Sequence, residues 1–252
     1  MSKYLRNRAF LFTVVTGLFA TCIAWWLLHD IETTPAIDTS VEGYYTFNPE
    51  SILKSLDQSN ADIFERQSID FEPTIITPDV TVQWNQANYF QIASALHANI
   101  LDEPIADRNL HFMIFRAGCE QMDEGPQQAV FEFYRITQPF FQKKGYKETI
   151  NIDPATNSIW FQNERLSSRE IYSQSINLLQ LKVSANDAFR IAEDNGGRKA
   201  RLELENDCSV SAILAPDGSA QNWEVNYSNR DSAHIFDIII DEYTGEYEVI
   251  HP

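Results

Sequence analysis

The chain has 252 residues, enough for one large or two small domains, and its hydrophobic content of 44% is ordinary for a folded protein. It carries 36 acidic residues against 19 lysines and arginines, a formal net charge of −17. Because nucleic acid is bound by clustered basic side chains, this balance argues against nucleic acid as a partner. The one basic cluster beyond the N-terminus, Lys143, Lys144 and Lys147, is interpreted as a solvated rim.

Residues 9–28 predict a single transmembrane helix. They contain no charge and are rich in Phe, Leu, Val, Ile and Trp, and a helix of about 20 residues spans about 30 Å of hydrocarbon. Three basic residues precede the segment and acidic residues follow it, so the positive-inside rule places residues 1–8 in the cytoplasm. The sequence therefore predicts a single-pass cell-membrane protein with an extracytoplasmic C-terminal domain.

A cleaved signal peptide is the alternative for the same segment. A cleavable apolar core is about 7 to 15 residues long and ends at a small-x-small site. The best candidate site, Thr34-Pro35-Ala36, is interrupted by proline, so a retained anchor is favoured and cleavage stays open. Cys22, within the apolar segment, is interpreted as a buried thiol.

The rest of the chain is divided into a tether and two folded units. Residues 29–83 are rich in Thr, Asp, Ser, Glu and Pro and predict an extracytoplasmic tether. Residues 84–165 predict a first α+β unit, with a helix from Asn85 followed by an antiparallel meander of strands. The apolar face of that helix consists of Tyr89, Ile92, Ala93, Leu96 and Ile100.

Residues 166–252 predict a second unit of the same order. A helix over 184–194 is stopped by Asn195-Gly196-Gly197, and strands are expected at 200–204, 210–214, 223–227 and 235–240. The expected fold class is α+β: two tandem helix-plus-antiparallel-meander units after the transmembrane helix. Because one unit of about 65 residues buries only a small core, the two units are expected to stack.

Two hairpin turns share the pattern I-x-I-D-x-x-T-N/G. They lie 88 residues apart, at Ile150 to Asn157 and at Ile238 to Gly245. An Asp at the start of such a turn accepts hydrogen bonds from backbone N–H groups, and Asn or Gly tolerates a positive φ at its end. We therefore interpret Asp153, Asn157, Asp241, Thr244 and Gly245 as structural turn residues, and Asp153 with Asp241 not as a catalytic pair.

Three segments of the second unit resemble the PepSY domain. They are the helix Ser184-Ala185-Asn186-Asp187-Ala188-Phe189-Arg190-Ile191-Ala192-Glu193-Asp194-Asn195-Gly196-Gly197, the strand Trp223-Glu224-Val225 and the hairpin Ile240-Asp241-Glu242-Tyr243-Thr244-Gly245-Glu246. The first unit lacks the Gly-Gly stop and the W-x-V strand, so only its hairpin suggests a degenerate second copy. The resemblance implies a cystatin-like module of an extracytoplasmic, often membrane-tethered protein, associated with peptidase inhibition, protein binding or a structural role, and without catalytic residues.

Cys119 and Cys208 each follow the predicted first strand of their own unit, 89 residues apart. If the units pack through that edge, the two cysteines form a disulfide, which an extracytoplasmic compartment permits. A bridge needs Cα atoms within about 7 Å, which tandem units do not guarantee, so the hypothesis of two free thiols stays open.

No recognisable catalytic, cofactor-binding or metal-binding motif is present. The histidines are scattered, and the acidic pairs Asp102-Glu103, Asp123-Glu124 and Glu203 with Glu205 lack the spacing of a calcium loop. The leading hypothesis is a non-enzymatic, membrane-anchored extracytoplasmic binding or assembly module, an accessory subunit with a protein partner at or near the membrane. The alternatives are an extracytoplasmic peptidase inhibitor or regulator, and an enzyme without a recognisable motif.

Overall fold

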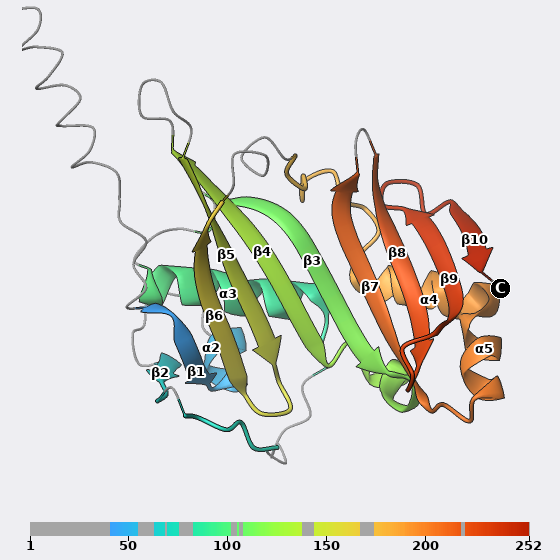
Figure 1. Cartoon of the computed structure of the whole chain (residues 1–252), viewed down its shortest axis with the longest axis horizontal. Coiled ribbons are helices and arrows are strands. Elements are labelled where there is room, and N and C mark those ends of the chain that lie inside the picture. Colours follow the sequence, from blue (N-terminus) through green and yellow to red (C-terminus); the bar gives the residue numbers. More distant parts are fainter. Residues whose placement is uncertain are drawn as a thin grey trace, which may run out of the picture.

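The computed structural model describes residues 41–54, 63–68, 70–75, 83–101, 105, 108–137, 144–166, 174–217 and 220–251. Within these residues, ten strands form one antiparallel sheet in the order β10-β9-β8-β7-β3-β4-β5-β6-β1-β2 (Figure 1). The strands are β1 (Gly43–Phe47), β2 (Phe64–Arg66), β3 (Asn109–Gly118), β4 (Gln128–Thr137), β5 (Lys144–Asp153), β6 (Ser158–Arg165), β7 (Cys208–Asp217), β8 (Ala220–Asn229), β9 (His234–Asp241) and β10 (Tyr247–His251).

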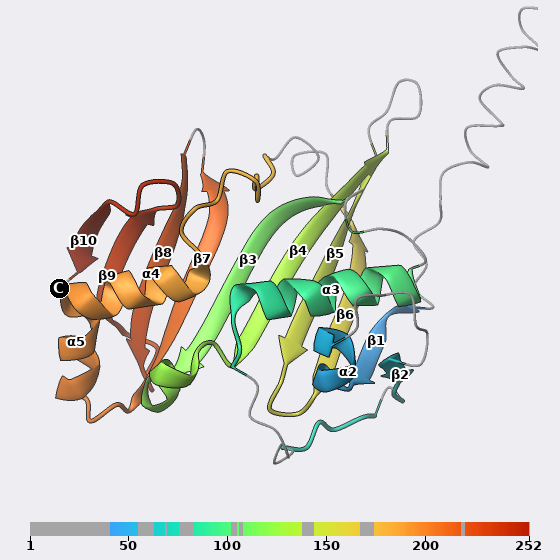
Figure 2. The ribbon, with the colours of Figure 1, turned by 180° about the vertical axis from the view of Figure 1, so that it is seen from behind.

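The helical elements are α2 (Pro49–Lys54), α3 (Gln86–Ile100), η4 (Cys119–Glu124), α4 (Ala185–Ala192), η6 (Glu193–Gly197) and α5 (Arg198–Glu203). Seen from behind, α3 and α4 cover the same face of the sheet (Figure 2). The apolar face predicted for α3 is buried at Tyr89, Ile92, Ala93 and Leu96. Alternate strand residues meet it, because successive side chains of a strand point to opposite faces. The ring of Phe115, on β3, lies 5.9 Å from the ring of Tyr89 between centroids.

Both long helices begin at side-chain caps. Asn85 Oδ1 accepts from the backbone N–H of Asn88 at 3.0 Å, and Ser184 forms a capping box with Asp187. The chain after α4 kinks at Asn195 and at Gly196, where φ is 131°, and then continues as α5. A positive φ interrupts the helical hydrogen bonds, so the Asn-Gly-Gly segment turns the helix instead of ending it.

The N-termini of α3 and α4 cap each other. The backbone N–H of Gln86 donates to Asn186 Oδ1 at 3.2 Å, and the N–H of Ala185 donates to Gln86 Oε1 at 2.7 Å. First-turn N–H groups have no partner inside their own helix, so each helix satisfies one such group of the other. The sheet has an N-terminal half, β1 to β6 with α3, and a C-terminal half, β7 to β10 with α4. These two hydrogen bonds join the two halves on the helical side of the sheet.

The expectation of two stacked units with separate sheets is wrong. β3 pairs with β7 along a register from Met113 with Leu214 to Gly118 with Ser209, so all ten strands belong to one sheet. Stacking would have left the outer edge of each of these strands unpaired, whereas pairing the two edges satisfies their N–H and C=O groups. The strand expected at 200–204 is also wrong, because Arg198–Glu203 is helix α5.

The prediction of a single-pass membrane protein also needs correction. Within the residues that the structure describes, no helix is both long enough and apolar enough to cross a bilayer. The span predicted at 9–28 lies outside the described residues. Part of the predicted tether belongs to the sheet, since β1 pairs with β6 and with β2.

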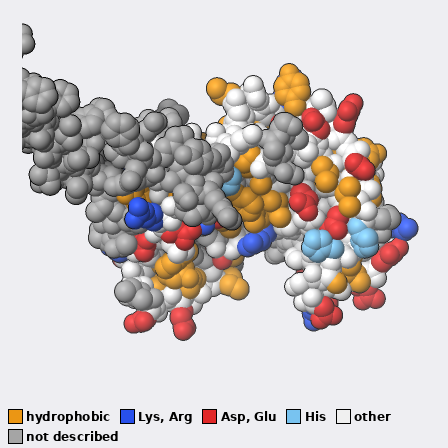
Figure 3. All heavy atoms as spheres, turned by 45° about the horizontal axis from the view of Figure 1, so that its top comes forward, with side chains coloured by type: hydrophobic (Ala, Val, Ile, Leu, Met, Phe, Trp, Pro, Cys, Tyr) orange, Lys and Arg blue, Asp and Glu red, His pale blue; other side chains and the backbone are white. Residues whose placement is uncertain are grey.

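The surface reflects the acidic composition of the chain. On the face seen in Figure 3, Asp and Glu side chains (red) lie among hydrophobic ones (orange) over the right-hand half, which holds β7 to β10. The chain contains six acidic residues and no lysine or arginine from Asp231 to Pro252. The C-terminal end of the sheet is therefore both acidic and partly apolar.

Candidate functional site

The first hairpin turn joins β5 to β6. Asp153 Oδ1 accepts from the backbone N–H of Ala155 at 2.9 Å, and the N–H of Asn157 donates to the carbonyl of Pro154 at 3.2 Å. Asn157 has a φ of 48°. Its carbonyl accepts from the N–H of Phe47 at 3.0 Å. This turn therefore also holds the end of β1 against the sheet.

The second hairpin turn joins β9 to β10. Asp241 Oδ1 accepts from the backbone N–H groups of Tyr243 at 3.0 Å and of Thr244 at 2.6 Å, and from the hydroxyl of Thr244 at 2.9 Å. Gly245 has a φ of 76°, and its N–H donates to the carbonyl of Asp241 at 2.9 Å. The bonds from Thr244 and Tyr243 lower the pKa of Asp241.

We expect Asp241→Ala to lower the free energy of unfolding by about 1 kcal/mol through the lost turn hydrogen bonds. Gly245→Val should cost about 1–3 kcal/mol, because it forces a β-branched residue to positive φ. A Cβ at Gly245 would lie 3.6 Å from Ile191 Cδ1, which is an ordinary contact, so the Cβ itself does not clash and its cost is backbone strain. Urea denaturation at pH 7 measures both changes.

The effect of Asp241→Ala should also depend on pH. Since the folded-state pKa of Asp241 is lowered, its contribution is complete above the ordinary value of 3.8 and is lost as the pH falls through the folded-state pKa. The difference between wild type and Asp241→Ala should therefore shrink below about pH 4. Asp231→Ala, in the exposed β8–β9 turn, is the control. A difference that grows on acidification would contradict the assigned role.

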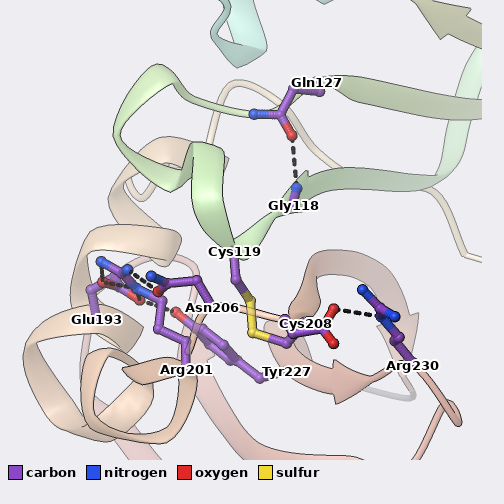
Figure 4. The surroundings of a disulfide bond; sticks show 10 residues. Gly118, Cys119, Gln127, Glu193, Arg201, Asn206, Cys208, Tyr227 and Arg230 are labelled. Carbon is purple, nitrogen blue, oxygen red and sulfur yellow. Dashed lines mark hydrogen bonds and ion pairs between the residues drawn. A yellow bond between two sulfur atoms is a disulfide. The ribbon is translucent and has the colours of Figure 1, made fainter. Parts of the chain in front are cut away.

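Cys119 and Cys208 are joined by a disulfide, with their Cα atoms 5.3 Å apart (Figure 4). Cys119 follows the C-terminal end of β3, whereas Cys208 begins β7. The expected strand at 200–204 implied that the two cysteines occupy equivalent positions in two units. They do not, because one follows its strand and the other begins its strand. They meet because β3 and β7 run antiparallel, one step beyond the pair Gly118 and Ser209.

A charged network lies beside the disulfide (Figure 4). Arg201 Nε donates to both carboxylate oxygens of Glu193, at 3.1 and 3.0 Å, and the hydroxyl of Tyr227 donates to the same carboxylate at 2.8 Å. Burial and the neighbouring Glu193 raise the pKa of Tyr227, so its hydroxyl stays protonated as a donor. Because Glu193 is fully engaged within the protein, we interpret the network as structural.

Two surface depressions adjoin this network. One of about 160 Å³ lies between η4 and α4 and includes Asp123, Asn186 and Arg190, and one of about 520 Å³ lies beside α5. Both depressions contain paired opposite charges, such as Arg198 with Glu193 at 3.6 Å and Lys199 with Glu203 at 3.9 Å. Neither depression presents a set of unopposed charges that would select a ligand.

A second charged cluster is buried under α3. Arg108 Nε lies 2.8 Å from Glu148 Oε2, and His97 Nε2 lies 3.8 Å from the same oxygen. All three side chains are buried. Sequence reasoning missed this cluster, although Glu148 is in phase with the buried Ile150 and Ile152 along β5, a pattern that marks an inward carboxylate. We interpret it as a structural ion pair in the core.

The residues that the structure describes contain no group of three or more His, Cys, Asp or Glu side chains able to hold a metal ion. Asp102 and Glu103 lie outside those residues. Lys147, from the basic cluster, forms an ion pair with Glu164 and lies 3.8 Å from Glu132, so at least this lysine is balanced within the sheet.

The C-terminal edge of the sheet gathers exposed apolar side chains. Tyr243 and Tyr247 are each 50% exposed and Ile250 is 53% exposed. The turn that carries Tyr243 is held in place, because the carbonyl of Glu242 accepts from the N–H groups of Lys182 and Val183. Lys182 Nζ also lies 3.7 Å from the ring centroid of Tyr243. This edge is therefore a fixed surface that exposes aromatic side chains.

Comparison with known proteins adds no relative to these observations: no family model, curated protein or solved structure matches this chain.

Proposed function

We propose that this chain is a non-catalytic protein-binding or assembly module that contacts its partner through β10 and the turn at Asp241 to Gly245. The observation that carries the proposal is the clustering of exposed apolar residues. Six large hydrophobic side chains are exposed among the described residues, namely Ile75, Leu179, Leu202, Tyr243, Tyr247 and Ile250. Three of the six lie within eight residues of sequence, at one edge of the sheet.

Tyrosine is enriched at the centres of protein interfaces, because it supplies a large contact area at a low cost in side-chain entropy. The turn is already ordered by its hydrogen bonds to Lys182 and Val183, so binding would not have to order it. Protein binding is also among the roles that the resemblance to PepSY domains implies. The polar clusters of the described residues support a non-catalytic role, because Glu193 and Glu148 are held by arginines inside the protein.

Site-specific photo-cross-linking of the full chain tests the proposal. A benzophenone amino acid at position 247 should yield a discrete protein adduct in cells that naturally produce this chain. The same amino acid in place of Gln162, which is exposed on β6, should yield no such adduct. The captured protein should then bind the purified chain, and Tyr247→Ser with Ile250→Ser should weaken that binding at least tenfold, as expected for two central apolar residues. Equal adducts from both positions, or undiminished binding by the double variant, would refute the proposal.

A further inference from the structure

We infer that β10 binds an extended segment of its partner as an additional strand, and that this segment alternates basic and apolar residues. The inference rests on the proposed function and specifies its chemistry. β10 ends the strand order, and no described strand pairs with its outer side. An exposed strand edge offers backbone N–H and C=O groups that can pair with an extended peptide.

The register identifies the outward-facing backbone groups. The N–H of Asp241 donates to the carbonyl of Glu246, and Glu248 lies opposite Ile239 in the ladder. Hydrogen-bonded positions alternate along an antiparallel strand, so Glu248 directs its backbone groups toward β9. Tyr247 and Val249 therefore direct theirs toward the open edge. The register shift after Val249 limits the available strand to the segment from Glu246 to Val249.

The two ends of the sheet differ in their capacity for strand addition. At the far end, β2 has only three residues, Phe64 to Arg66, and a very short edge strand offers few backbone groups. β10 is longer and combines its outward backbone groups with the exposed side chains of Tyr247 and Ile250. The structure thus favours β10 as the receptive edge.

Charge selects the kind of segment. The side chains of Tyr247 and Val249 point to the helical face, since their partners Ile240 and Ile238 are buried there. The side chain of Glu248 points to the opposite face, where Glu224 lies one strand beyond Ile239. An added strand would therefore place apolar residues beside Tyr247 and Val249, and basic residues beside Glu248.

The same charges disfavour a second copy of this chain as the occupant. Two β10 edges paired with each other would bring Glu246 and Glu248 of both copies together, and like charges on directly opposed residues destabilise a sheet. The net charge of −17 adds a general repulsion between copies. A basic segment of another protein avoids both costs.

Fluorescence anisotropy with defined probes tests the inference on the full chain. The probe is a fluorescein-labelled decapeptide of alternating Lys and Val, and its control is the matched peptide of alternating Glu and Val. The lysine peptide should bind the wild type and the glutamate peptide should not. Val249→Pro should weaken binding at least tenfold, because proline removes the outward N–H and is tolerated at a sheet edge. Glu248→Lys should weaken it by a similar factor.

Several results would overturn strand addition, whereas the proposed function is tested separately by cross-linking from position 247. If Tyr247→Ser weakens binding but Val249→Pro does not, the edge binds through side chains alone and only the inference fails. Binding that no β10 variant changes is non-specific attraction to an acidic protein and overturns the inference. Absence of lysine-peptide binding also overturns it, while cross-linking from position 247 decides the proposed function separately.

A wild-type dimer that Val249→Pro dissolves would assign the edge to a second copy. Unchanged thermal unfolding of each variant shows that the fold is intact.

Discussion

Reduction of the Cys119–Cys208 disulfide should lower the free energy of unfolding by about 4 kcal/mol. The bridge joins residues 89 positions apart, and closing a loop of that length removes roughly this much conformational freedom from the unfolded chain. It also fixes the end of the β3–β7 ladder, through which the two halves share one sheet. Guanidinium denaturation with and without reductant measures the difference.

The variant Cys119→Ala with Cys208→Ala is the matched control. It retains Cys22, so any effect of the reductant on that thiol appears in the variant as well. The variant should have the stability of the reduced wild type and should not respond to reductant. If the oxidised and reduced wild type are equally stable, the β3–β7 ladder does not need the disulfide, and the expected loss of stability is contradicted.

The elements of this fold that the sequence predicts well are those with local signals. The helix predicted from Asn85 corresponds to α3, because its cap and its apolar period lie within a few residues of each other. The strands on either side of the two Asp-initiated turns pair as β5 with β6 and β9 with β10, since turn chemistry is read from four or five neighbouring residues.

The features that were not predicted depend on contacts between distant residues. The pairing of β3 with β7 joins residues about 100 positions apart, such as Met113 and Leu214, and neither strand carries a local signal for the other. The reciprocal caps of Gln86 and Asn186 depend on the same juxtaposition. The short apolar alternation at 200–204 predicts a strand, but so short a pattern does not distinguish a strand from a turn of helix, and residues 200–203 belong to α5.

The candidate binding edge was only partly visible in the sequence. The sequence predicts the hairpin and its turn residues, and the acidic character of the C-terminal segment follows from its composition. The position of β10 at the edge of the sheet depends on the order of the ten strands. The interpretation as two separate units did not predict that order. Exposure of Tyr247 and Ile250 follows from that position, because neither residue has a partner strand on its outer side among the described residues.

Gly197→Ala should lower the free energy of unfolding by about 2–3 kcal/mol, the upper part of the range of about 1–3 kcal/mol for an overpacked core. A Cβ at this position would lie 2.6 Å from both Cζ and Oη of Tyr227. Gly197 has an ordinary helical φ of −57°, so the penalty is steric and not conformational. The ring of Tyr227 is fully buried and its hydroxyl is bonded to Glu193, which leaves it little room to move. Urea denaturation measures the loss.

Gly118→Ala is the matched control for the same added methyl group. A Cβ at Gly118 would lie 3.4 Å from the flexible side chain of Gln121, so this variant should change stability by less than about 0.5 kcal/mol. Tyr227→Leu shortens the opposing side chain, so adding Gly197→Ala to that background should cost less than adding it to the wild type. Additive effects in the double variant, or equal losses for Gly197→Ala and Gly118→Ala, would show that the Gly-Gly segment does not need glycine for its approach to Tyr227. If the effects are not additive, Gly197 is required because it packs closely against Tyr227 of β8. A need for glycine in the turn itself would then not explain this position.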